Sequence, residues 1–385
     1  MSLDTDSIMV LMKNRTKHEA YAIAQSISKE ATEFFGWPHV LEVEKMSPDA
    51  NEPGGFLLIG KKRYCFLKYE TPDSVPYLSS SGLENVRRDN AILTSKTMQT
   101  CLELMVKDGK PQKAIDYVHG QLRLLLTGKI DMSQLIISKG LSKTEKHYEE
   151  STSRQTHAEL AKRIKKRSAV TGETIPHTGD RVKFVITDGH KNAKTYELAE
   201  DPLYVMQNDI PINTTYYIEK QMLKPLIKIF TPLLAPNECT FKYNTKGERK
   251  DKTLKEYKAL TAYKTLFTGP HMRILNKKTA VVGGMAGFIQ KTSRCISCKA
   301  PSKKPVCMTC TQNGLAPAIY MEEMAKQRDL EKKYNEYWTQ CQRCTGTMIK
   351  SVECGNQDCG NFFRREAVKK DLKKQCEKVA WFDDW

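Results

Sequence analysis

Cys295-Ile296-Ser297-Cys298 opens the stretch of this sequence that most limits its fold. Three further cysteine groups follow it: Cys307-Met308-Thr309-Cys310, Cys341-Gln342-Arg343-Cys344, and the pair Cys354 and Cys359. A C-x-x-C pair places two thiolates on one side of a tight turn, and four thiolates complete the tetrahedral shell that Zn²⁺ prefers. The spacing therefore predicts two metal centres, the first held by Cys295, Cys298, Cys307 and Cys310 and the second by Cys341, Cys344, Cys354 and Cys359.

A disulfide framework is the alternative interpretation of these cysteines. The sequence argues against it, because the first ten residues carry Asp4 and Asp6 and no basic head, so no secretory signal is indicated. A chain of 385 residues is also long enough to fold without covalent staples. Cysteines that bind metal must stay reduced, so we expect the cytosol or the nucleus.

The overall composition limits the class of protein. The length allows two or three domains, and the net charge is +17. A chain this basic binds a polyanion or belongs to an assembly with an acidic partner. The longest apolar stretch, residues 280–289, is too short to cross a bilayer, which takes about 20 residues, so we expect no membrane partner.

Hydrophobic periodicity predicts a mixed α and β chain. Residues 8–12 look like a buried strand, and residues 17–35 look like a helix that Gly36 ends. Short strands are expected at 39–46, 56–60, 63–69 and 182–186. Helices are expected at 91–108, 111–127, 155–167 and 214–230, the last divided or kinked at Pro225, and two more surround the second cysteine set.

Asp4-Thr5-Asp6-Ser7 puts two carboxylates on one turn between apolar residues. Two carboxylates held together repel each other, so a cation would stabilise the pair, and Mg²⁺ prefers such oxygen ligands. This layout is typical of a two-metal phosphoryl-transfer site. A plain turn or helix cap is the other interpretation that the residues allow.

Two basic segments are candidates for nucleic-acid contact. Lys61-Lys62-Arg63-Tyr64 follows Gly60 at a hairpin-like turn and suits a phosphate backbone, although a solvated turn has the same composition. The run at 162–167 fits a solvated face, a localisation signal or a nucleic-acid contact. The eight histidines form no recognisable nucleophile system.

These segments together resemble the C-terminal part of family B DNA polymerases of the delta type. Asp4-Thr5-Asp6-Ser7 is similar to the end of that family's YGDTDS palm motif, and Lys61-Lys62-Arg63-Tyr64 matches its KKRY motif. Residues 82–90, GLENVRRDN, are similar to its GLETVRRDN segment. Further similarities follow in a consistent order, to the thumb at 136–139, 157–161, 179–182 and 200–205, and to the second cysteine motif at 338–344.

The resemblance implies an α+β fold: a partial polymerase palm (antiparallel sheet plus helix), a mainly helical thumb, and a cysteine-rich metal-binding C-terminal domain. The implied boundaries are 1–75 for the palm remnant, 76–265 for the thumb, 266–294 for a linker and 295–385 for the cysteine-rich domain. The implied reaction is template-directed addition of deoxynucleoside triphosphates to a primer 3′ end by two-metal catalysis in DNA replication.

The resemblance also implies roles for individual residues. Asp6 would bind both catalytic Mg²⁺ ions with Asp4 beside it, and Lys61, Lys62, Arg63 and Tyr64 would hold the primer–template DNA. The first cysteine set would bind Zn²⁺ and assist work with a sliding clamp. The second set would hold a 4Fe-4S cluster and dock the accessory B-subunit, although its spacing suits zinc equally well. Cys376, outside both sets, is expected to be a structural thiol.

One departure from the family pattern limits the expected activity. The family motif has Tyr-Gly before its first Asp, whereas Ser2-Leu3 stands here after Met1. Two-metal catalysis needs carboxylates from both palm segments, so we expect a split half that works with an N-terminal polymerase half, or a partial gene product that is inactive alone. The rival hypothesis is a non-catalytic DNA- and subunit-binding module. Replication implies the nucleus, or a cytoplasmic site for a viral source.

Overall fold

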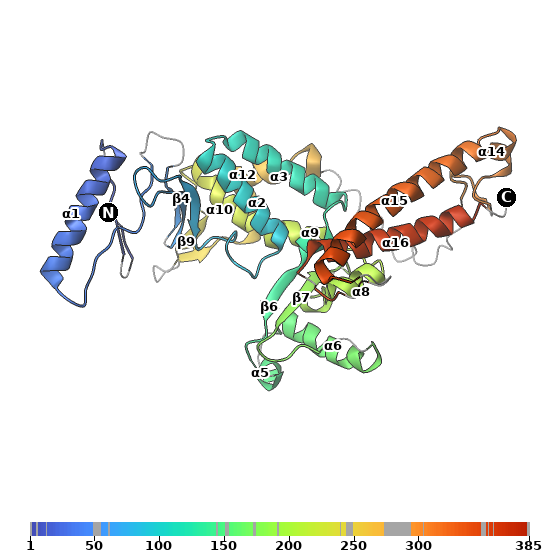
Figure 1. Cartoon of the computed structure of the whole chain (residues 1–385), viewed down its shortest axis with the longest axis horizontal. Coiled ribbons are helices and arrows are strands. Elements are labelled where there is room, and N and C mark those ends of the chain that lie inside the picture. The colour runs from blue at the N-terminus through green and yellow to red at the C-terminus, as the bar shows by residue number, and fades with distance from the viewer. Residues whose placement is uncertain are drawn as a thin grey trace.

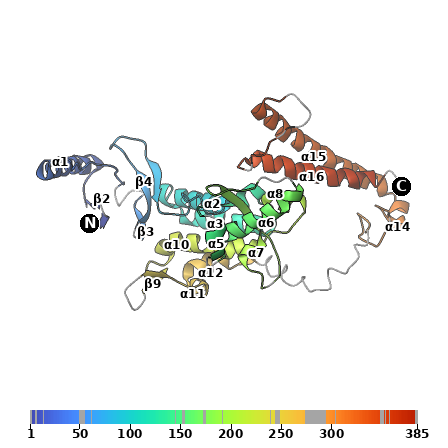
Figure 2. The same ribbon diagram turned by 90° about the horizontal axis from the view of Figure 1, so that it is seen from below.

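The computed structural model describes the chain from residue 2 to residue 382, except for residues 5–6, 13, 49–54, 61, 144, 151–153, 172–174, 191, 239, 244–248, 273–293, 303, 348–351, 353 and 357. The molecule is elongated. Helix α1 (Lys17–Phe35) lies at one end, small sheets and helices fill the centre, and two long antiparallel helices form the other end (Figure 1). A second view, turned by 90°, keeps α1 and the C-terminus at opposite ends (Figure 2).

The N-terminal residues form a small hairpin and one helix. Strands β1 (Ser2–Asp4) and β2 (Ser7–Met9) pair antiparallel, with Asp4 opposite Ser7, as the predicted tight turn requires. Helix α1 begins at Thr16, whose Oγ1 accepts a hydrogen bond from the backbone N–H of Glu19 in a capping box. It ends at Gly36, which has φ +65°, so the predicted helix is confirmed.

Two predictions for this end of the molecule are wrong. The segment at 8–12 is not buried, because Ile8, Val10 and Leu11 are 48%, 54% and 70% exposed. No strand forms over 39–46 apart from a single bridge between Met46 and Tyr69. The backbone N–H of Leu41 instead donates to the side chain of Thr32 on α1. This segment is therefore bonded to the helix and does not pair with a neighbouring strand.

A three-stranded antiparallel sheet connects this end to the centre. Its order is β3 (Leu57–Gly60), β4 (Arg63–Lys68) and β5 (Tyr77–Ser81), with β4 in the middle. Successive side chains of a strand point to opposite faces. Cys65 and Leu67 accordingly join the main core, while Phe66 belongs to a row of aromatic rings with Tyr64 and Phe56.

The main core is built by helices behind this sheet. Buried residues of α3 (Pro111–Leu126) recur at every third or fourth position, as a helix that buries one face requires. They pack with α2 (Ile92–Leu102), the π-helical turn η1 (Glu103–Lys107), α10 (Leu223–Leu234) and α12 (Thr261–Phe267). Helix α10 continues from α9 (Thr214–Tyr216) and a second π-helical turn, η2 (Tyr217–Met222), directly before Pro225.

A second sheet of three antiparallel strands lies beside the helices. It consists of β6 (Ile137–Gly140), β7 (Arg181–Ile186) and β8 (Ala199–Glu200). Buried Tyr217 ties it to the core, since its hydroxyl donates to the Leu135 carbonyl at 2.7 Å and accepts from the Ile186 N–H at 3.2 Å. The surrounding helices are α4 (Met132–Leu135), α5 (Glu145–Glu150), α6 (Thr156–Thr171), α7 (Thr195–Leu198) and α8 (Pro202–Gln207).

The C-terminal half ends in a helical hairpin. A small hairpin of β9 (Phe241–Tyr243) and β10 (Arg249–Asp251) precedes α11 (Leu254–Ala259), α12 and the 3₁₀ turn η3 (Pro270–Met272). Beyond residues 273–293, α14 (Met308–Gln312) leads into α15 (Ala316–Thr345), which packs along α16 (Gly360–Ala380). The buried carboxylate of Glu323 on α15 joins the two helices by accepting from Gln375 and Lys378 of α16.

The first turns of α16 fix the hairpin to the centre. Phe362 and Phe363 are buried in the main core. Arg364 pairs with Asp131 at 2.9 Å, and farther along the helix Lys370 and Lys374 both pair with Asp209 at 2.8 and 2.6 Å. Apolar burial and ion pairs therefore attach the same helix to the residues that precede the cysteine-rich segment.

Candidate functional site

The first cysteine set forms a compact cluster at the tip of the hairpin. Among the residues that the structure describes, Cys295, Cys298, Cys307 and Cys310 are the one group of potential metal ligands whose ligand atoms lie within 4.8 Å of one another. The Sγ atoms of Cys298 and Cys307 are 3.5 Å apart. Zn–S bonds of about 2.3 Å in a tetrahedron put sulfurs about 3.8 Å apart, so this spacing fits one zinc ion.

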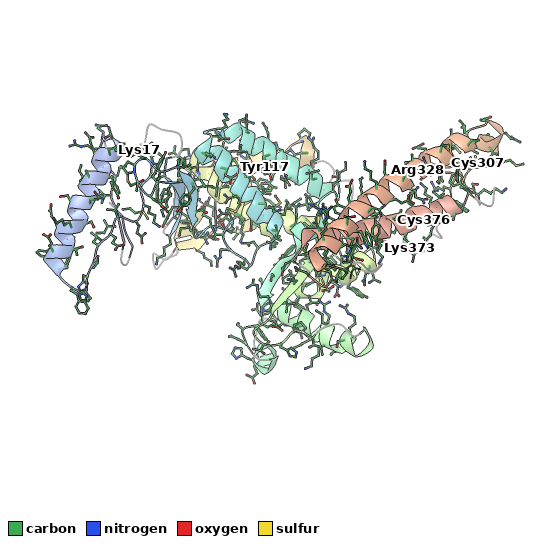
Figure 3. The ribbon with its side chains drawn as sticks, viewed as in Figure 1. Lys17, Tyr117, Cys307, Arg328, Lys373 and Cys376 are labelled. Atoms are coloured by element: carbon green, nitrogen blue, oxygen red, sulfur yellow. The ribbon has the colours of Figure 1, made fainter. Side chains whose placement is uncertain are left out.

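Local structure positions these four sulfurs. Cys307 is the N-cap of α14, and Figure 3 labels it near the end at which α15 begins. A small apolar cluster of Val306, Ala316 and Phe382 buries Cys295 and Cys310. Phe382 follows α16, so the residues directly after this helix support the cluster.

The electrostatics of the cluster favour a bound cation. Burial opposes ionisation of Cys295, but backbone N–H groups, of which the Cys307 N–H lies 3.3 Å from its Sγ, lower its pKa to about 6. Hydrogen bonds with Cys307 and Cys298 raise the pKa of Cys310 to about 12. Four crowded thiols cannot all ionise without a compensating positive charge, and a metal ion supplies it.

The second cysteine set lies at the other end of the hairpin, against the main core. Cys341 and Cys344 are in the last turn of α15, and Cys359 is the N-cap of α16. Cys341 is buried and Cys344 exposed, while Cys354 and Cys359 pack against the main core. These four do not form a group within 4.8 Å like the first set. Cys376 is exposed on α16 (Figure 3), so the expected structural thiol is not a core residue.

The acidic bend lies at the opposite end of the molecule from the first cysteine cluster. Asp4 is the last residue of β1, where only its backbone is described, and Asp6 lies outside the described residues. The hairpin does bring the chain back immediately after Asp4, because Asp4 pairs with Ser7. The relation of the two carboxylates therefore stays a prediction from the sequence.

The basic turn between β3 and β4 is held by a glycine that sequence reasoning did not single out. Lys62 has φ +60°, and Lys61 lies outside the described residues. Gly82 has φ +64° and approaches so closely that a Cβ there would lie 2.2 Å from the Lys62 carbonyl oxygen. Arg63 pairs with Glu84 at 3.6 Å, and the ring of Tyr64 stacks on Phe56 with centroids 5.3 Å apart. Residues 82–84 thus set the shape of this turn.

Part of the basic run on α6 has a structural role. Arg163 donates to the backbone carbonyls of Tyr196, Glu197 and Ala199. Arg167 pairs with Glu200 at 3.2 Å and stacks over the ring of Tyr204 at 4.0 Å. These two arginines fix β8 and the adjoining helices, whereas Lys165 and Lys166 are exposed.

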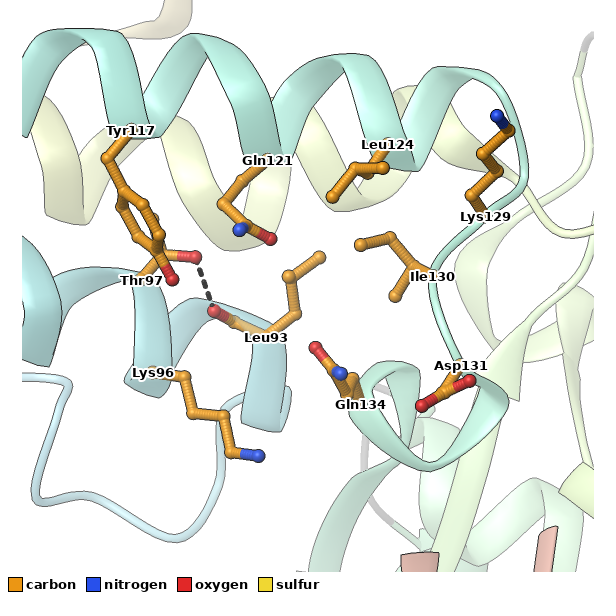
Figure 4. A pocket seen from close by; sticks show the side chains of 10 residues that line it. All are labelled: Leu93, Lys96, Thr97, Tyr117, Gln121, Leu124, Lys129, Ile130, Asp131 and Gln134. Atoms are coloured by element: carbon orange, nitrogen blue, oxygen red, sulfur yellow. Dashed lines mark hydrogen bonds between the residues drawn. The ribbon is translucent and has the colours of Figure 1, made fainter. Parts of the chain in front are cut away.

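A hollow lies between α2, α3 and the loop that leads into α4 (Figure 4). Leu93, Leu124 and Ile130 form its apolar part, and the Thr97 hydroxyl donates to the Leu93 carbonyl at 2.7 Å. The lining includes no cysteine or histidine, and its one carboxylate, Asp131, pairs with Arg364. It therefore offers no metal-ligand set. None of the described helices has the length and apolar character needed to cross a bilayer.

Comparison with known families agrees with the order of these sites along the chain. DNA polymerase family B matches residues 4–233, and the C4-type zinc-finger of DNA polymerase delta matches residues 295–365. The second match contains both cysteine sets. The geometry of the first set and this match together indicate a zinc-binding site.

Two curated relatives of this chain carry the same name. The DNA polymerase delta catalytic subunit of Caenorhabditis elegans is 37% identical over 99% of this chain, and that of Drosophila melanogaster is 35% identical over 98%. The chain spans about a third of the length of each, 32% in both cases. The solved structure of the family B DNA polymerase from Pyrobaculum calidifontis is also similar. The match includes 53% of this chain and 24% of the solved chain, with 24% sequence identity and a TM-score of 0.39. The family match covers more than half of the residues, and this chain therefore belongs to DNA polymerase family B, as a C-terminal part of the delta type.

Proposed function

We propose that this chain supplies the C-terminal palm segment, the thumb and the metal-binding domain of a delta-type replicative DNA polymerase in the nucleus. The complete enzyme would add deoxynucleotides from deoxynucleoside triphosphates to a primer 3′ end. One observation carries the proposal: a family B region and a four-cysteine cluster with zinc spacing occur in one chain, in the order found in delta catalytic subunits. The domain boundaries at residues 75, 265 and 294 are part of this proposal.

Asp4 and Asp6 would belong to the catalytic centre. The antiparallel pairing of Asp4 with Ser7 supports this role, since the hairpin keeps the bend short. Carboxylates and phosphate oxygens are the ligands that Mg²⁺ prefers, and bound Mg²⁺ would stabilise the charge that develops on the transferred phosphate. The chain's own contribution is to hold two carboxylates on one turn. Residues from the remaining two thirds of the polymerase would complete the site.

Lys61, Lys62, Arg63 and Tyr64 would contact the sugar–phosphate backbone of the primer–template duplex. The close approach of Gly82 supports this role, because it fixes a turn at which cations follow one another. Arg63 is partly neutralised by Glu84, with side chains 30% and 15% exposed. Backbone contacts of this type position a duplex without selecting its sequence, as a replicative enzyme requires.

The two cysteine sets would serve different partners. The first set, zinc-binding and at the tip of the hairpin, would assist a sliding clamp. The second set would hold a 4Fe-4S cluster and dock the accessory B-subunit. Four cysteine thiolates are the usual donor set for such a cluster.

A non-catalytic module that binds duplex DNA and an accessory subunit is the second candidate. The chain spans only about a third of its curated relatives, which favours this alternative for the isolated polypeptide. Primer extension separates the two functions. The chain is assayed alone and in a mixture with a polypeptide that carries the remaining N-terminal part of the polymerase, including the other palm segment. Extension only in the mixture supports a polymerase half, and no extension in either sample leaves the binding module.

A further inference from the structure

Two histidines from different elements stack their rings on each other. His119 belongs to α3 and His271 to η3, and these two elements pack together. The ring centroids are 4.0 Å apart and the ring planes are inclined by 23°. His271 is only 6% exposed, and His119 is half-buried. The pair therefore joins η3, the last described turn before the first cysteine set, to a helix of the main core.

The same two rings bond the last turn of α12. Nε2 of His119 donates to the Thr265 carbonyl at 3.0 Å, and Nε2 of His271 donates to the Leu266 carbonyl at 3.0 Å. A carbonyl oxygen only accepts hydrogen bonds, so both histidines carry a proton on Nε2. The last four carbonyls of a helix have no partner within the helix. The neutral pair thus closes the end of α12 and holds η3 at the same time.

The surroundings of His271 oppose a second proton, which would bind Nδ1. A Cβ at Gly269 would lie 3.2 Å from this Nδ1, so the backbone of Gly269 packs against that edge of the ring. Among the described residues, the charged or titratable groups that face His271 are His119 and Arg123, both on α3, while α12 presents the Leu266 carbonyl. Burial first, and then His119 and Arg123, hold the pKa of His271 below its usual value, although the bond to Leu266 opposes this.

We propose that His119 and His271 form a proton-sensitive latch, in which the neutral pair holds η3 on α3 and binding of a solvent proton to Nδ1 of His271 opens it. No covalent bond forms or breaks. The charged imidazolium is stable only where water can hydrate it, so it leaves its buried position. The Leu266 carbonyl then loses its donor, the stacking on His119 ends, and η3 separates from α3. This inference does not depend on the polymerase assignment.

Two local measurements on the full chain test the latch. NMR follows the ring signals of the eight histidines as the pH falls. Hydrogen exchange detected by mass spectrometry, corrected for intrinsic rates, follows the peptide that contains η3. A histidine in the open state titrates near about 6.5, so η3 should open up to about 10-fold more often at about pH 5.5 than at about pH 7.5. The His271 signal should titrate below that usual value.

Two glutamine variants separate the latch from other effects of acid. The amide nitrogen of His271→Gln can donate to the Leu266 carbonyl but takes up no proton, so its η3 should stay equally protected at both pH values. His18→Gln is the matched control, because His18 is exposed and pairs with Asp73 at 3.1 Å. This control should keep the full acid response. Both variants keep the same cysteines, so a difference between them does not come from metal loss.

Three results would overturn the inference. They are a His271 signal that titrates at or above about 6.5, equal exchange of η3 at both pH values in the unaltered chain, and an acid response in His271→Gln as large as in His18→Gln. The first two need no variant to fold. Burial, with Lys139, also lowers the pKa of His157, so acid unfolding of the whole chain would not identify the latch. Exchange at η3 does.

Discussion

Replacing Gly82 by alanine should damage the basic turn that we assign to DNA contact. A Cβ at this position would lie 2.2 Å from the backbone oxygen of Lys62, and the residue has φ +64°. The left-handed conformation costs a non-glycine residue about 1 to 2 kcal/mol. Forcing an added methyl group into a packed site costs about 1 to 3 kcal/mol more. We therefore expect Gly82→Ala to lower the free energy of unfolding by about 2 to 5 kcal/mol.

Gly128→Ala is the matched control, because Gly128 has the same left-handed backbone conformation as Gly82 but has room for a Cβ atom. Gly128 has φ +70°, and a Cβ there would meet nothing within 4 Å. This variant should lose only the conformational part, about 1 to 2 kcal/mol. Urea unfolding followed by circular dichroism measures both. Equal losses for the two variants would refute the argument that the Lys62 backbone and Gly82 hold each other in place.

The same pair of variants tests the assignment to DNA. Gly82→Ala should weaken duplex binding and flatten its dependence on salt, since each lost phosphate contact lowers the slope of log K against log salt by about 1. Gly128→Ala should leave both unchanged. Fluorescence anisotropy with a labelled primer–template duplex measures the affinity between low and moderate salt. Unchanged affinity and slope in Gly82→Ala would contradict the DNA-contact role of the turn.

Three further changes have definite expected outcomes. Phe363→Ala removes a fully buried ring that joins α16 to the main core, so it should cost about 3 to 5 kcal/mol and make the hairpin easier to release by limited proteolysis. Glu323→Ala leaves two lysines and Gln375 without their shared acceptor and should lower the free energy of unfolding of the metal-free chain by about 1 to 3 kcal/mol. Cys298→Ser should lose about one zinc ion per chain by metal analysis.

Each of these has a control of the same residue type. Phe34→Ala, at a ring 83% exposed, should cost little. Glu322→Ala, at a side chain 67% exposed, should stay within about 0.5 kcal/mol. Cys376→Ser should keep its metal, since that thiol is exposed and outside both sets. A variant that loses no more stability or metal than its control would contradict the role that we give to the altered residue.

The Glu323 carboxylate also predicts a pH dependence with a definite sign. Burial opposes its ionisation, but Gln375, Lys378 and Lys326 lower its pKa from 4.5 to about 2. Because the folded-state pKa is depressed, its stabilisation is fully present above pH 4.5 and is lost as the pH falls towards 2. In the metal-free chain, Glu323→Gln should remove part of this acid sensitivity, and an unchanged profile would contradict it.

Local sequence signals predicted the regular elements well. Gly36 marks the end of α1, and the spacing of apolar residues from Ala114 to Leu126 marks α3. The capping box of Thr16 and Glu19 at the start of α1 was not among the predictions. The turn at Asp4 to Ser7 and the central strand β4 follow from equally local patterns. The compact first cysteine set follows from its two C-x-x-C pairs. These features depend on residues that are close together in the sequence, so they can be predicted without knowledge of the fold.

Features that depend on distant residues were missed. Strand β5 carries the serines 79–81, which favour strands little, and forms because it pairs with β4. Arg163 looks like a surface charge in the sequence, yet it donates to backbone carbonyls that only the fold brings close. Arg365 also looks like a surface charge, yet it is buried. Burial at 8–12 was predicted from hydrophobicity, but burial also needs an element that covers the strand, and no described residue does so.

Primer extension by the two-polypeptide mixture tests the central claim most directly when the acidic bend is altered. Asp6→Ala removes a carboxylate that we assign to Mg²⁺, and Asp73→Ala removes an exposed one that faces His18. The account predicts that the mixture extends primers with the unaltered chain and with Asp73→Ala, but not with Asp6→Ala. Equal extension with Asp6→Ala would contradict it.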